Sequence, residues 1–592
     1  MRSVFSFLKP YRRHLVIGPA FKLAEAVLEL AMPLLIAYMI DTGIESQDRT
    51  LIWRLGLLAL LMAATGLGCA TVCQYTASLA SQGVGTDLRH ALFSKINHLS
   101  LRQLDHFGTS SLVNRLTGDV NLLQQAVAML IRLVVRAPFL SIGGLIMAMT
   151  IDLRLSLILL LILPIFILIV YLIMSWTIPK YRKIQQVVDR LMRHILENLT
   201  GVRVIRAFAR RSAEKKRFDL ENDQVAALQI RVSRISNLLN PVTALILNAA
   251  TIALLWVGAI RIEDGALTRG QIIALINYVG QILTALLVVA NLVILYTRAY
   301  ASAGRVAEIL DLPNEGDSRL PEASLIEEDQ QPAGEELPPV DPDHWLRFDR
   351  VQFQYPDTAA PIFDRLDFTV GRGRSLGIIG PTGSGKSTLA WLLLRLWPLT
   401  SGQIWFDGQP LAASDLTPSD LNIAIVPQKS VLFSGTIAEN LRLGRADATD
   451  DELWQALRVA QAETFVRRLD DGLHSQVQRG GVNFSGGQRQ RLAVARALVS
   501  RPRLLIMDDS TSALDYATEA ALRRALAGSG SFARMRLIII SQRVASIRQT
   551  DEIVILDDGR LAGQGTHDDL LKENRLYQEI WQSQQSNGEV VG

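Results

Sequence analysis

An eight-residue glycine-rich segment, 380–387, has the residue types and spacing of a P-loop, which holds the phosphates of a nucleotide. An apolar stretch at 375–379 precedes it and another at 389–396 follows it, which predicts a strand before the loop and a helix after it. Glycines let backbone N–H groups curl around phosphate oxygens at the N-terminus of such a helix. The residues predicted to bind the phosphates of ATP are Gly380, Thr382, Gly383, Ser384, Gly385, Lys386, Ser387 and Thr388.

Three further side chains are predicted to complete this site. The apolar stretch 504–507 ends in Asp508, a carboxylate placed to hold Mg²⁺ together with the hydroxyl of Ser387. Gln428 also follows an apolar stretch and is predicted to contact Mg²⁺ or a water. Tyr355 precedes a Pro-Asp turn that favours exposure, so we expect it to stack on the adenine ring; the alternative is a buried core tyrosine.

A second anion-binding segment, Ser485-Gly486-Gly487-Gln488, opens a basic, Gln-rich stretch. A serine and two glycines at the beginning of a helix offer free N–H groups to an anion. A lone Ser-Gly-Gly sequence is also typical of a linker. Its position shortly before the Asp508 strand makes the signal specific, and these four residues are therefore expected to bind ATP as well.

The elements that must position this chemistry include a membrane domain. A chain of 592 residues with positive mean hydropathy is too long for one soluble core, since single cores stop growing at about 250–300 residues. Six stretches have the roughly 20 apolar residues that a membrane-spanning helix requires. They lie near 15–40, 54–80, 127–150, 153–177, 238–262 and 271–300. The predicted fold class is an α-helical transmembrane domain of six spans with long cytoplasmic helical extensions, followed by an α/β P-loop nucleotide-binding domain.

The placement of Lys and Arg predicts how the spans are oriented. The N-terminus and the connections 81–126 and 178–237 carry many basic residues, whereas the opposite connections are short and mixed in charge. Both termini, both long connections and the nucleotide-binding domain are therefore expected in the cytoplasm, and the spans in a bacterial inner (plasma) membrane. The net charge of only +4, spread between apolar segments, argues against nucleic-acid binding.

Both long connections show apolar residues at helical spacing, over 88–104 and 191–208, which predicts helices that continue beyond the bilayer. Within the first span, Lys22, Glu25 and Glu29 are costly in lipid. Two interpretations stay open for them. They pair on one face as structural contacts, or they line a polar path for a substrate.

The predicted domains are a transmembrane domain at 1–310, a linker at 311–345 and a nucleotide-binding domain at 346–592. The linker is acidic and rich in proline. Such a composition cannot bury enough apolar surface to fold, so the linker is predicted to be a flexible tether.

With six spans, two long connections, a tether and these nucleotide-binding motifs in order, the chain resembles a half-transporter of the ATP-binding cassette (ABC) exporter family over nearly its whole length. The resemblance implies that two half-transporters associate and sandwich two ATP molecules. Each ATP would touch the P-loop of one chain and the Ser-Gly-Gly-Gln signature of the other. The resemblance also implies coupling helices near 108–115 and 196–204, which transmit force to the nucleotide-binding domains.

Four features depart from the pattern of that family: Phe484 replaces the usual Leu of the signature, the loop 477–481 before it lacks the usual Glu-Arg-Gly pattern, and Asp509 and Gln542 stand at two catalytic positions. Asp509 stands where the family usually has a glutamate that polarises the attacking water, and Gln542 where it usually has a histidine that contacts the γ-phosphate. A carboxylate one methylene shorter must move or use an extra water, and an amide cannot become cationic. The predicted catalytic residues Asp509, Gln542 and Gln428 thus belong to a slow site. Two losses beside an intact P-loop favour the hydrolysis-impaired half of a heterodimer over a homodimer that tolerates both variants.

The predicted function is ATP-driven export of small amphipathic molecules, such as drugs or lipids, across the plasma membrane. The partner would be a second ABC half-transporter with a complete catalytic site, where most ATP is hydrolysed. The alternatives are a homodimeric exporter, an exporter-shaped importer of a chelated metal, and a non-transporting regulator or ATP-gated channel.

Overall fold

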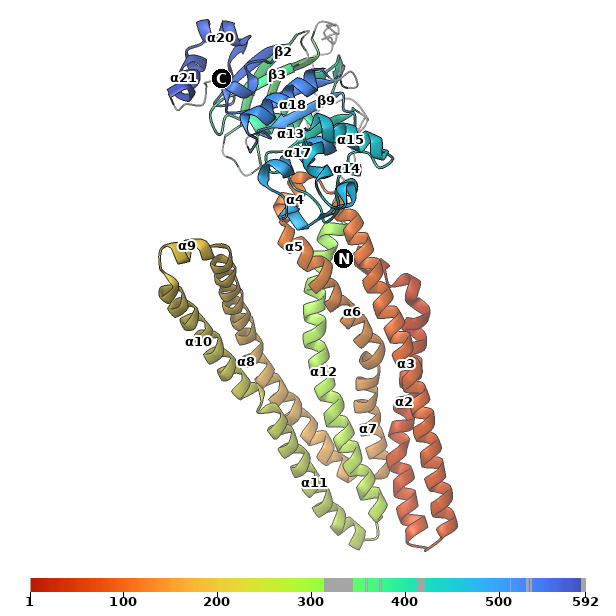
Figure 1. The fold of residues 1–592 in the computed structure, drawn as a ribbon. Coiled ribbons are helices and arrows are strands. Elements are labelled where there is room, and N and C mark those ends of the chain that lie inside the picture. The colour runs from red at the N-terminus through yellow and green to blue at the C-terminus, as the bar shows by residue number, and fades with distance from the viewer. Residues whose placement is uncertain are drawn as a thin grey trace, which may run out of the picture. The chain divides into compact units, whose positions relative to one another are not determined.

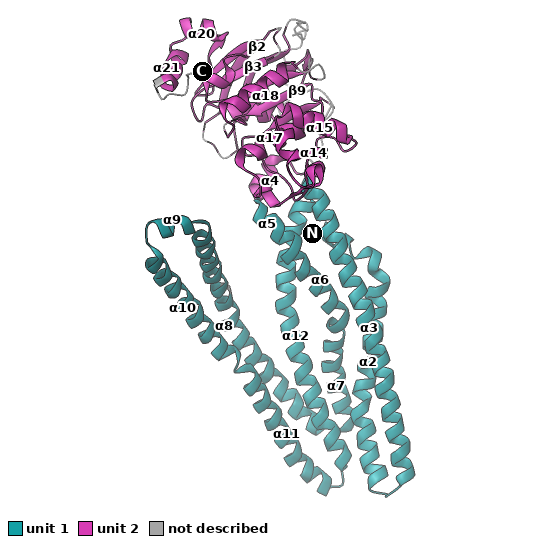
Figure 2. Cartoon of the chain, in the orientation of Figure 1, with its two compact units in different colours: residues 1–97, 108–312 teal, residues 98–107, 313–592 magenta. Residues whose placement is uncertain are grey.

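The structure is a computed structural model, and it describes residues 2–313, 344–356, 358, 360–371, 373, 375–411, 421–511, 513–528, 532 and 535–586. The chain forms two compact units, coloured separately in Figure 2. The first contains residues 1–97 and 108–312, and the second contains residues 98–107 and 313–592. Residues 314–343, which make up most of the predicted linker, lie outside the described residues.

Long helices build the first unit (Figure 1). Its helices are α1 (Arg2–Ser6), α2 (Arg12–Tyr38), α3 (Arg49–Asn97), α5 (Thr109–Asn114), α6 (Val120–Met129), α7 (Arg136–Ile151), α8 (Leu153–Thr200), α9 (Val202–Ala207), α10 (Arg211–Ser236), α11 (Leu239–Glu263) and α12 (Arg269–Leu310). Within the described residues, six helical segments are long and apolar enough to cross a membrane, and each contains one of the six predicted spans.

A single aspartate makes the tight turn between the third and fourth of these segments. Asp152 is buried and extended, and its Oδ1 accepts a hydrogen bond from the backbone N–H of Leu155 at 2.9 Å. This bond satisfies an N–H group that the start of α8 would otherwise leave open. Its Oδ2 accepts from Arg261 of α11 at 2.6 Å, so the turn also ties α11 to α8.

The three ionisable residues of the first span pair as the structural interpretation predicts, although Glu29 pairs with another helix, and a substrate path stays a prediction. Lys22 donates to Glu25 at 2.7 Å, which is the structural pairing. Glu29 instead pairs with Arg136 of α7 at 2.7 Å and lines a cavity. The pairing across α2 and α7 keeps both charges compensated among the helices, as charges at membrane depth require.

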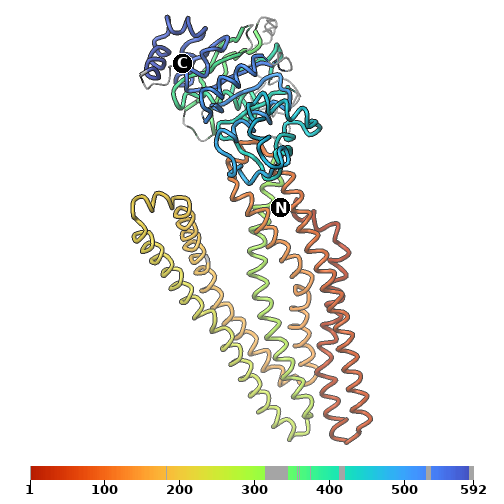
Figure 3. Tube along the Cα trace, in the orientation of Figure 1, coloured from red at the N-terminus to blue at the C-terminus, as the bar shows by residue number. Residues whose placement is uncertain are grey.

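The predicted helical extensions exist, but both are interrupted. After α3 the chain starts a new helix, α4 (Leu101–Phe107), because Ser100 and Gln103 cap it reciprocally, each side chain bonding the backbone N–H of the other. The second extension breaks at Gly201, a weak helix former, and continues as α9. Figure 3 shows α9 at the tip of the hairpin that α8 and α10 form.

A buried histidine joins the two arms of that hairpin. His194 of α8 is 4% exposed; its Nε2 lies 2.9 Å from Glu214 Oε2 and its Nδ1 lies 3.1 Å from Glu221 Oε2, both on α10. Both contacts are hydrogen bonds only when both ring nitrogens carry protons. These bonds raise the pKa of His194, and the bond to Glu214 has the largest effect. Burial and the charge of Arg217 lower the pKa but do not outweigh the bonds.

Two large sheets and one short strand pair lie in the described part of the second unit, which also contains α4. The strands are β1 (Leu346–Phe353), β2 (Phe363–Val370), β3 (Ser375–Ile379), β4 (Ser401–Phe406), β5 (Gln409–Pro410), β6 (Ile423–Val426), β7 (Gly435–Thr436), β8 (Gln476–Val477), β9 (Leu504–Asp508), β10 (Arg536–Ile540), β11 (Glu552–Asp557) and β12 (Arg560–Gly565). One sheet is antiparallel, in the order β2-β1-β4-β5. The other, in the order β12-β11-β3-β10-β9-β6, is parallel except for β12. β7 and β8 form a separate short pair.

Helices accompany the sheets of this unit (Figure 1). They are α13 (Lys386–Leu393), α14 (Ile437–Arg442), α15 (Asp450–Val459), α16 (Glu463–Arg467), α17 (Gly486–Val499), α18 (Tyr516–Gly528), α19 (Val544–Ile547), α20 (His567–Glu573) and α21 (Arg575–Ser586). Helices α13, α17 and α19 are among those that contact the parallel sheet. An α-helical unit of six apolar helical segments followed by an α/β unit confirms the predicted fold class.

The first long connection contributes residues 98–107 to the second unit, ahead of the expected coupling helix at 108–115. Leu101 of α4 packs against the apolar core that β1, β2, β3 and α13 share. Residues 109–111 are Thr-Ser-Ser and offer no comparable apolar side chain. Leu101 thus attaches this part of the connection to the core of the second unit.

Replacement of His194 by glutamine tests the clamp between α8 and α10. The pKa of His194 is raised in the folded chain, so its stabilisation is complete below the unfolded value of about 6.5 and is lost as pH rises through the folded pKa. We expect His194→Gln to lower the melting temperature most at about pH 6 and least at about pH 9. Thermal unfolding of the full-length chain in nanodiscs measures this. The control is His90→Gln, on exposed surface of α3, and a pH-independent difference between His194→Gln and wild type would contradict the clamp.

Candidate nucleotide-binding site

The predicted site residues meet at one edge of the parallel sheet. The P-loop follows β3, Gln542 follows β10, Asp508 ends β9 and Gln428 follows β6, and these four strands are neighbours in that order. The carboxyl ends of parallel strands meet at the same edge, which is where such sheets bind ligands. The residues line a cavity of about 320 Å³. Its predicted members are Thr382, Gly383, Gly385, Lys386, Ser387, Thr388, Gln428, Asp508, Asp509 and Gln542.

Glycine is required at three positions of the P-loop. Gly383 and Gly385 have φ values of 90° and 94°, in the left-handed region that favours glycine. At Gly380, a Cβ atom would lie 2.0 Å from the carbonyl oxygen of Leu556. The loop therefore lies directly against the end of β11, and its backbone is free of side chains where phosphates would approach.

The charged side chains of the cavity are suited to polyphosphate and a divalent cation. The Ser387 hydroxyl donates to Asp508 Oδ1 at 3.1 Å, and Lys386 Nζ donates to the carbonyls of Gly380 and Pro381 at 2.9 and 2.6 Å. Burial raises the pKa of Asp508 and lowers the pKa of Lys386. Mg²⁺ beside the carboxylate and phosphate beside the ammonium would each favour the charged form, so the residues present fit Mg²⁺ and ATP.

The two predicted catalytic residues that depart from the family pattern lie in the same cavity. Asp509 follows β9 with a φ of 45°, and its Oδ2 accepts a hydrogen bond from Gln428 Nε2 at 3.3 Å. The side chain of Gln542 is exposed at the end of β10. The cavity thus combines both altered groups with an intact P-loop, and their catalytic roles stay predictions.

One residue that holds the Gln542 turn is not evident in the sequence. Gln584 of α21 donates from Nε2 to the carbonyl of Gln542 at 2.8 Å and accepts at Oε1 from the N–H of Val544 at 2.9 Å. One amide therefore fixes both sides of the turn. In the sequence, Gln584 is recognisable only as part of an amphipathic C-terminal helix. Such a pattern predicts that the helix packs on the domain, but it does not predict a contact with a residue 42 positions earlier.

Tyr355 is partly buried, between the two interpretations offered from the sequence. Its hydroxyl lies 3.1 Å from Thr388 Oγ1, and its ring meets Phe353 and Trp397 edge to face, at centroid distances of 4.8 and 5.0 Å. It does not appear among the described residues that line the cavity. Its contact with adenine stays a prediction, while its bond to Thr388 ties it to the helix of the P-loop.

The second predicted anion-binding segment starts α17. Ser485 and Gln488 form a capping box, in which each side chain accepts from the backbone N–H of the other. Gly486 and Gly487 occupy the first turn, whose N–H groups are not used by the helix itself. None of these four residues is among those described as lining the cavity. The segment is therefore available to a ligand other than one held by this chain's own P-loop.

Comparisons with known proteins agree on both halves of the chain. A family profile described as "ABC transporter transmembrane region" matches residues 15–286, and one described as "ABC transporter" matches residues 363–512. An uncharacterized ABC transporter ATP-binding protein of Mycobacterium tuberculosis is 36% identical over 590 residues, 99% of this chain and 98% of the relative. An ATP-dependent lipid A-core flippase of Chromobacterium violaceum is 31% identical over 97% of this chain and 96% of its own length.

A solved structure is similar over the same extent. A bacterial Atm1-family ABC exporter with ATP bound has a TM-score of 0.78 and 26% identity, and covers 97% of this chain and 98% of its own. The likeness therefore includes both compact units.

Removal of the P-loop ammonium should weaken nucleotide binding. A hydrogen bond to a charged group contributes about 1.5–3 kcal/mol, so Lys386→Ala should raise the Kd for ATP about 10–100-fold. Binding of a fluorescent ATP analogue to the full-length chain measures this. Lys572→Ala, an exposed lysine of α20, is the control and should bind as wild type does. Equal affinity of Lys386→Ala and wild type would exclude the P-loop as the phosphate site.

Proposed function

Because the chain belongs to the ABC transporter family and has the fold of its exporters, we propose that it exports small amphipathic molecules, such as drugs or lipids, as one half of a heterodimer. An ABC exporter of this kind is a multi-pass membrane protein that works as a dimer and carries an ATPase domain on each half. The heterodimer, the slow site and the class of substrate are the parts that we propose.

One observation supports the proposed heterodimer. Asp509 and Gln542 both line one cavity, and the P-loop of that cavity is intact. ATP binding depends on the loop, Lys386, Ser387 and Asp508, all of which are present. Hydrolysis needs a group that polarises the attacking water and a positive charge beside the γ-phosphate. Asp509 and Gln542 are the weaker groups at these two positions. Such a site would bind ATP but hydrolyse it slowly.

The signature segment supports a partner chain. Ser485, Gly486 and Gly487 begin α17, where helix N–H groups are open, and they are not among the described residues that line this chain's own cavity. In the proposed heterodimer, they complete the site on the partner's P-loop. Most ATP would then be hydrolysed there, at a site that has a complete set of catalytic residues.

An exposed apolar tip also supports association. At the end of the α8–α10 hairpin, Leu196, Leu199, Val204 and Phe208 are all exposed, Phe208 by 75%. Several large apolar side chains exposed on one short segment are more than the single ones that need no explanation, and they fit a protein interface. We propose that this tip, which includes the expected coupling helix at 196–204, contacts the nucleotide-binding domain of the partner.

The orientation belongs to the same proposal. Basic residues concentrate in the two long connections, so the nucleotide-binding domain and both termini face the cytoplasm of a bacterial cell. ATP binding would bring the nucleotide-binding domains together, and the connections would transmit this closure to the helices.

Restoring the two usual catalytic groups tests the slow site. Purified alone, the chain should bind ATP and hydrolyse it slowly, and Asp509→Asn should change little. The double variant Asp509→Glu, Gln542→His should hydrolyse ATP faster, by up to about 10²-fold, because misplacement of a reacting group costs that much. Phosphate release from full-length chain in nanodiscs measures the rate.

Asp557→Glu, an exposed carboxylate at the end of β11, is the matched control and should leave the rate unchanged. Fast hydrolysis by the wild-type chain alone that Asp509→Asn abolishes would contradict the heterodimer and support a working homodimer.

A further inference from the structure

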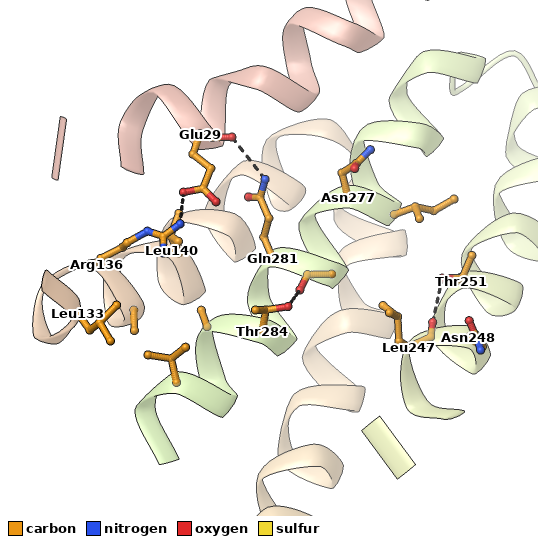
Figure 4. Close-up of a pocket in the computed structure, with 15 residues that line it drawn as sticks. Glu29, Leu133, Arg136, Leu140, Leu247, Asn248, Thr251, Asn277, Gln281 and Thr284 are labelled. Carbon is orange, nitrogen blue, oxygen red and sulfur yellow. Dashed lines mark hydrogen bonds and ion pairs between the residues drawn. The ribbon is translucent and has the colours of Figure 1, made fainter. Parts of the chain in front are cut away.

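A second cavity, of about 430 Å³, lies among the helices of the first unit. Residues of α2, α7, α11 and α12 line it, and its volume is within the range of pockets that hold small ligands. Figure 4 shows Glu29, Arg136 and Gln281 turned toward one another, with Asn248 and Thr251 of α11 on another side. The cavity is thus formed by these four helices together with Leu133 of the π-helical segment Leu130–Val134.

Amide groups supply much of its hydrogen-bonding capacity. Gln281 is held weakly, because its Nε2 donates to the carbonyl of Glu29 over 3.4 Å. Its Oε1 is buried and has no hydrogen-bond partner among the described residues. Asn248 and Asn277, both exposed, line the same cavity. An unmet acceptor in apolar surroundings is costly, so a ligand that donates a hydrogen bond to Gln281 is favoured.

The charges of the lining cancel. Glu29 and Arg136 are the charged members of the described lining, and they pair at 2.7 Å. A charged ligand would leave water without gaining a free counter-ion, which is unfavourable at membrane depth. The described lining therefore has no net charge, and Arg136 Nε, which is buried without a hydrogen-bond partner among the described residues, adds an open donor to the open acceptor of Gln281.

Apolar side chains make up the rest of the wall. They include Leu133, Leu140, Leu247, Ile276 and Val288. A ligand that fits both surfaces has a polar part that reaches the amides and an apolar part that lies on these side chains. Size, charge and lining together describe an amphiphile with an uncharged head group.

We infer that this cavity is the substrate site of the proposed exporter and takes amphiphiles whose uncharged head group carries hydroxyl or amide groups. Gln281 accepts a hydrogen bond from the head group, and the apolar side chains hold the tail. The inference rests on the proposed export function and names its substrate class.

Gly280 allows the cavity to be filled without strain. It lines the cavity, and a Cβ atom built on it would meet no atom within 4 Å. Leucine at this position should therefore occupy the cavity and also favour the helix. Gly304, on the same helix and outside the described lining, has equally open surroundings, so Gly304→Leu is the matched control.

The test uses the full-length chain in nanodiscs, in the oligomer in which it purifies. The probe is an octyl glucoside that carries a benzophenone photocrosslinker, and labelled peptides of α11 and α12 are counted by mass spectrometry. We expect labelling in wild type and in Gly304→Leu, and at least about a tenfold loss in Gly280→Leu. Equal labelling of Gly280→Leu and wild type would overturn the inference.

Competition tests the head-group chemistry. Octyl glucoside should suppress labelling at a concentration about tenfold lower than octyl sulfate or octyltrimethylammonium. Gln281→Leu should raise the octyl glucoside concentration required about tenfold, the effect of one lost hydrogen bond. Gln125→Leu, an exposed glutamine of α6 outside the described lining, should not. Equal competition by the charged compounds would overturn the selectivity.

Two additions complete the design. If the bilayer supplies the substrate, monoglucosyl diacylglycerol in the nanodisc lipids should suppress labelling. Undiminished labelling would assign the site to water-borne amphiphiles. Either result is compatible with amphiphiles that have an uncharged head group. ATP-dependent transport of octyl glucoside into inverted vesicles is measured separately. If the cavity is labelled but octyl glucoside is not transported, the proposed export function is contradicted. If Gly280→Leu transports octyl glucoside as wild type does, the assignment of this cavity as the substrate site is contradicted.

Discussion

The nucleotide site depends on how closely the P-loop approaches the ends of neighbouring strands. At Gly380 even one added carbon would meet the carbonyl of Leu556 at 2.0 Å, and at Gly385 it would meet the ring of Phe363 at 2.6 Å. This close packing places Ser387 within 3.1 Å of Asp508, two residues that are 121 positions apart. Since the sheet order sets β3, β10, β9 and β6 side by side, one constraint on the backbone assembles the hydroxyl, the carboxylates and the amides.

The membrane half is governed by a different constraint, the cost of unpaired charge. Lys22 pairs with Glu25 on one helix, whereas Glu29 requires Arg136 from another. The second pair connects α2 to α7 and leaves the cavity beside it neutral. Structural compensation and a polar lining are therefore not alternatives in this bundle, because the same ion pair supplies both.

Sequence patterns predict the features that are local. The glycine spacing of 380–387, an apolar strand before a carboxylate and six apolar stretches each indicate an element without knowledge of its neighbours. Contacts across long separations leave no such pattern. Gln584 on the Gln542 turn, and Glu29 with Arg136, are 42 and 107 positions apart and depend on the packing of helices. The helix break at Ser100 is intermediate, since its capping box is visible locally but competes with helical periodicity on both sides.

Binding and hydrolysis of ATP are separable in a site of this design, which is why the two substitutions matter. The groups that hold phosphate belong to the loop and to β9, and neither Asp509 nor Gln542 supports that geometry. Asp509 is instead bonded to Gln428, and Gln542 is held through its backbone by Gln584. Both positions keep their framework, and in the proposed slow site their side chains catalyse hydrolysis weakly. The P-loop keeps its glycines, Lys386 and Ser387, whereas the groups expected to act on water and the γ-phosphate differ, and this contrast is the reason for the proposed slow site.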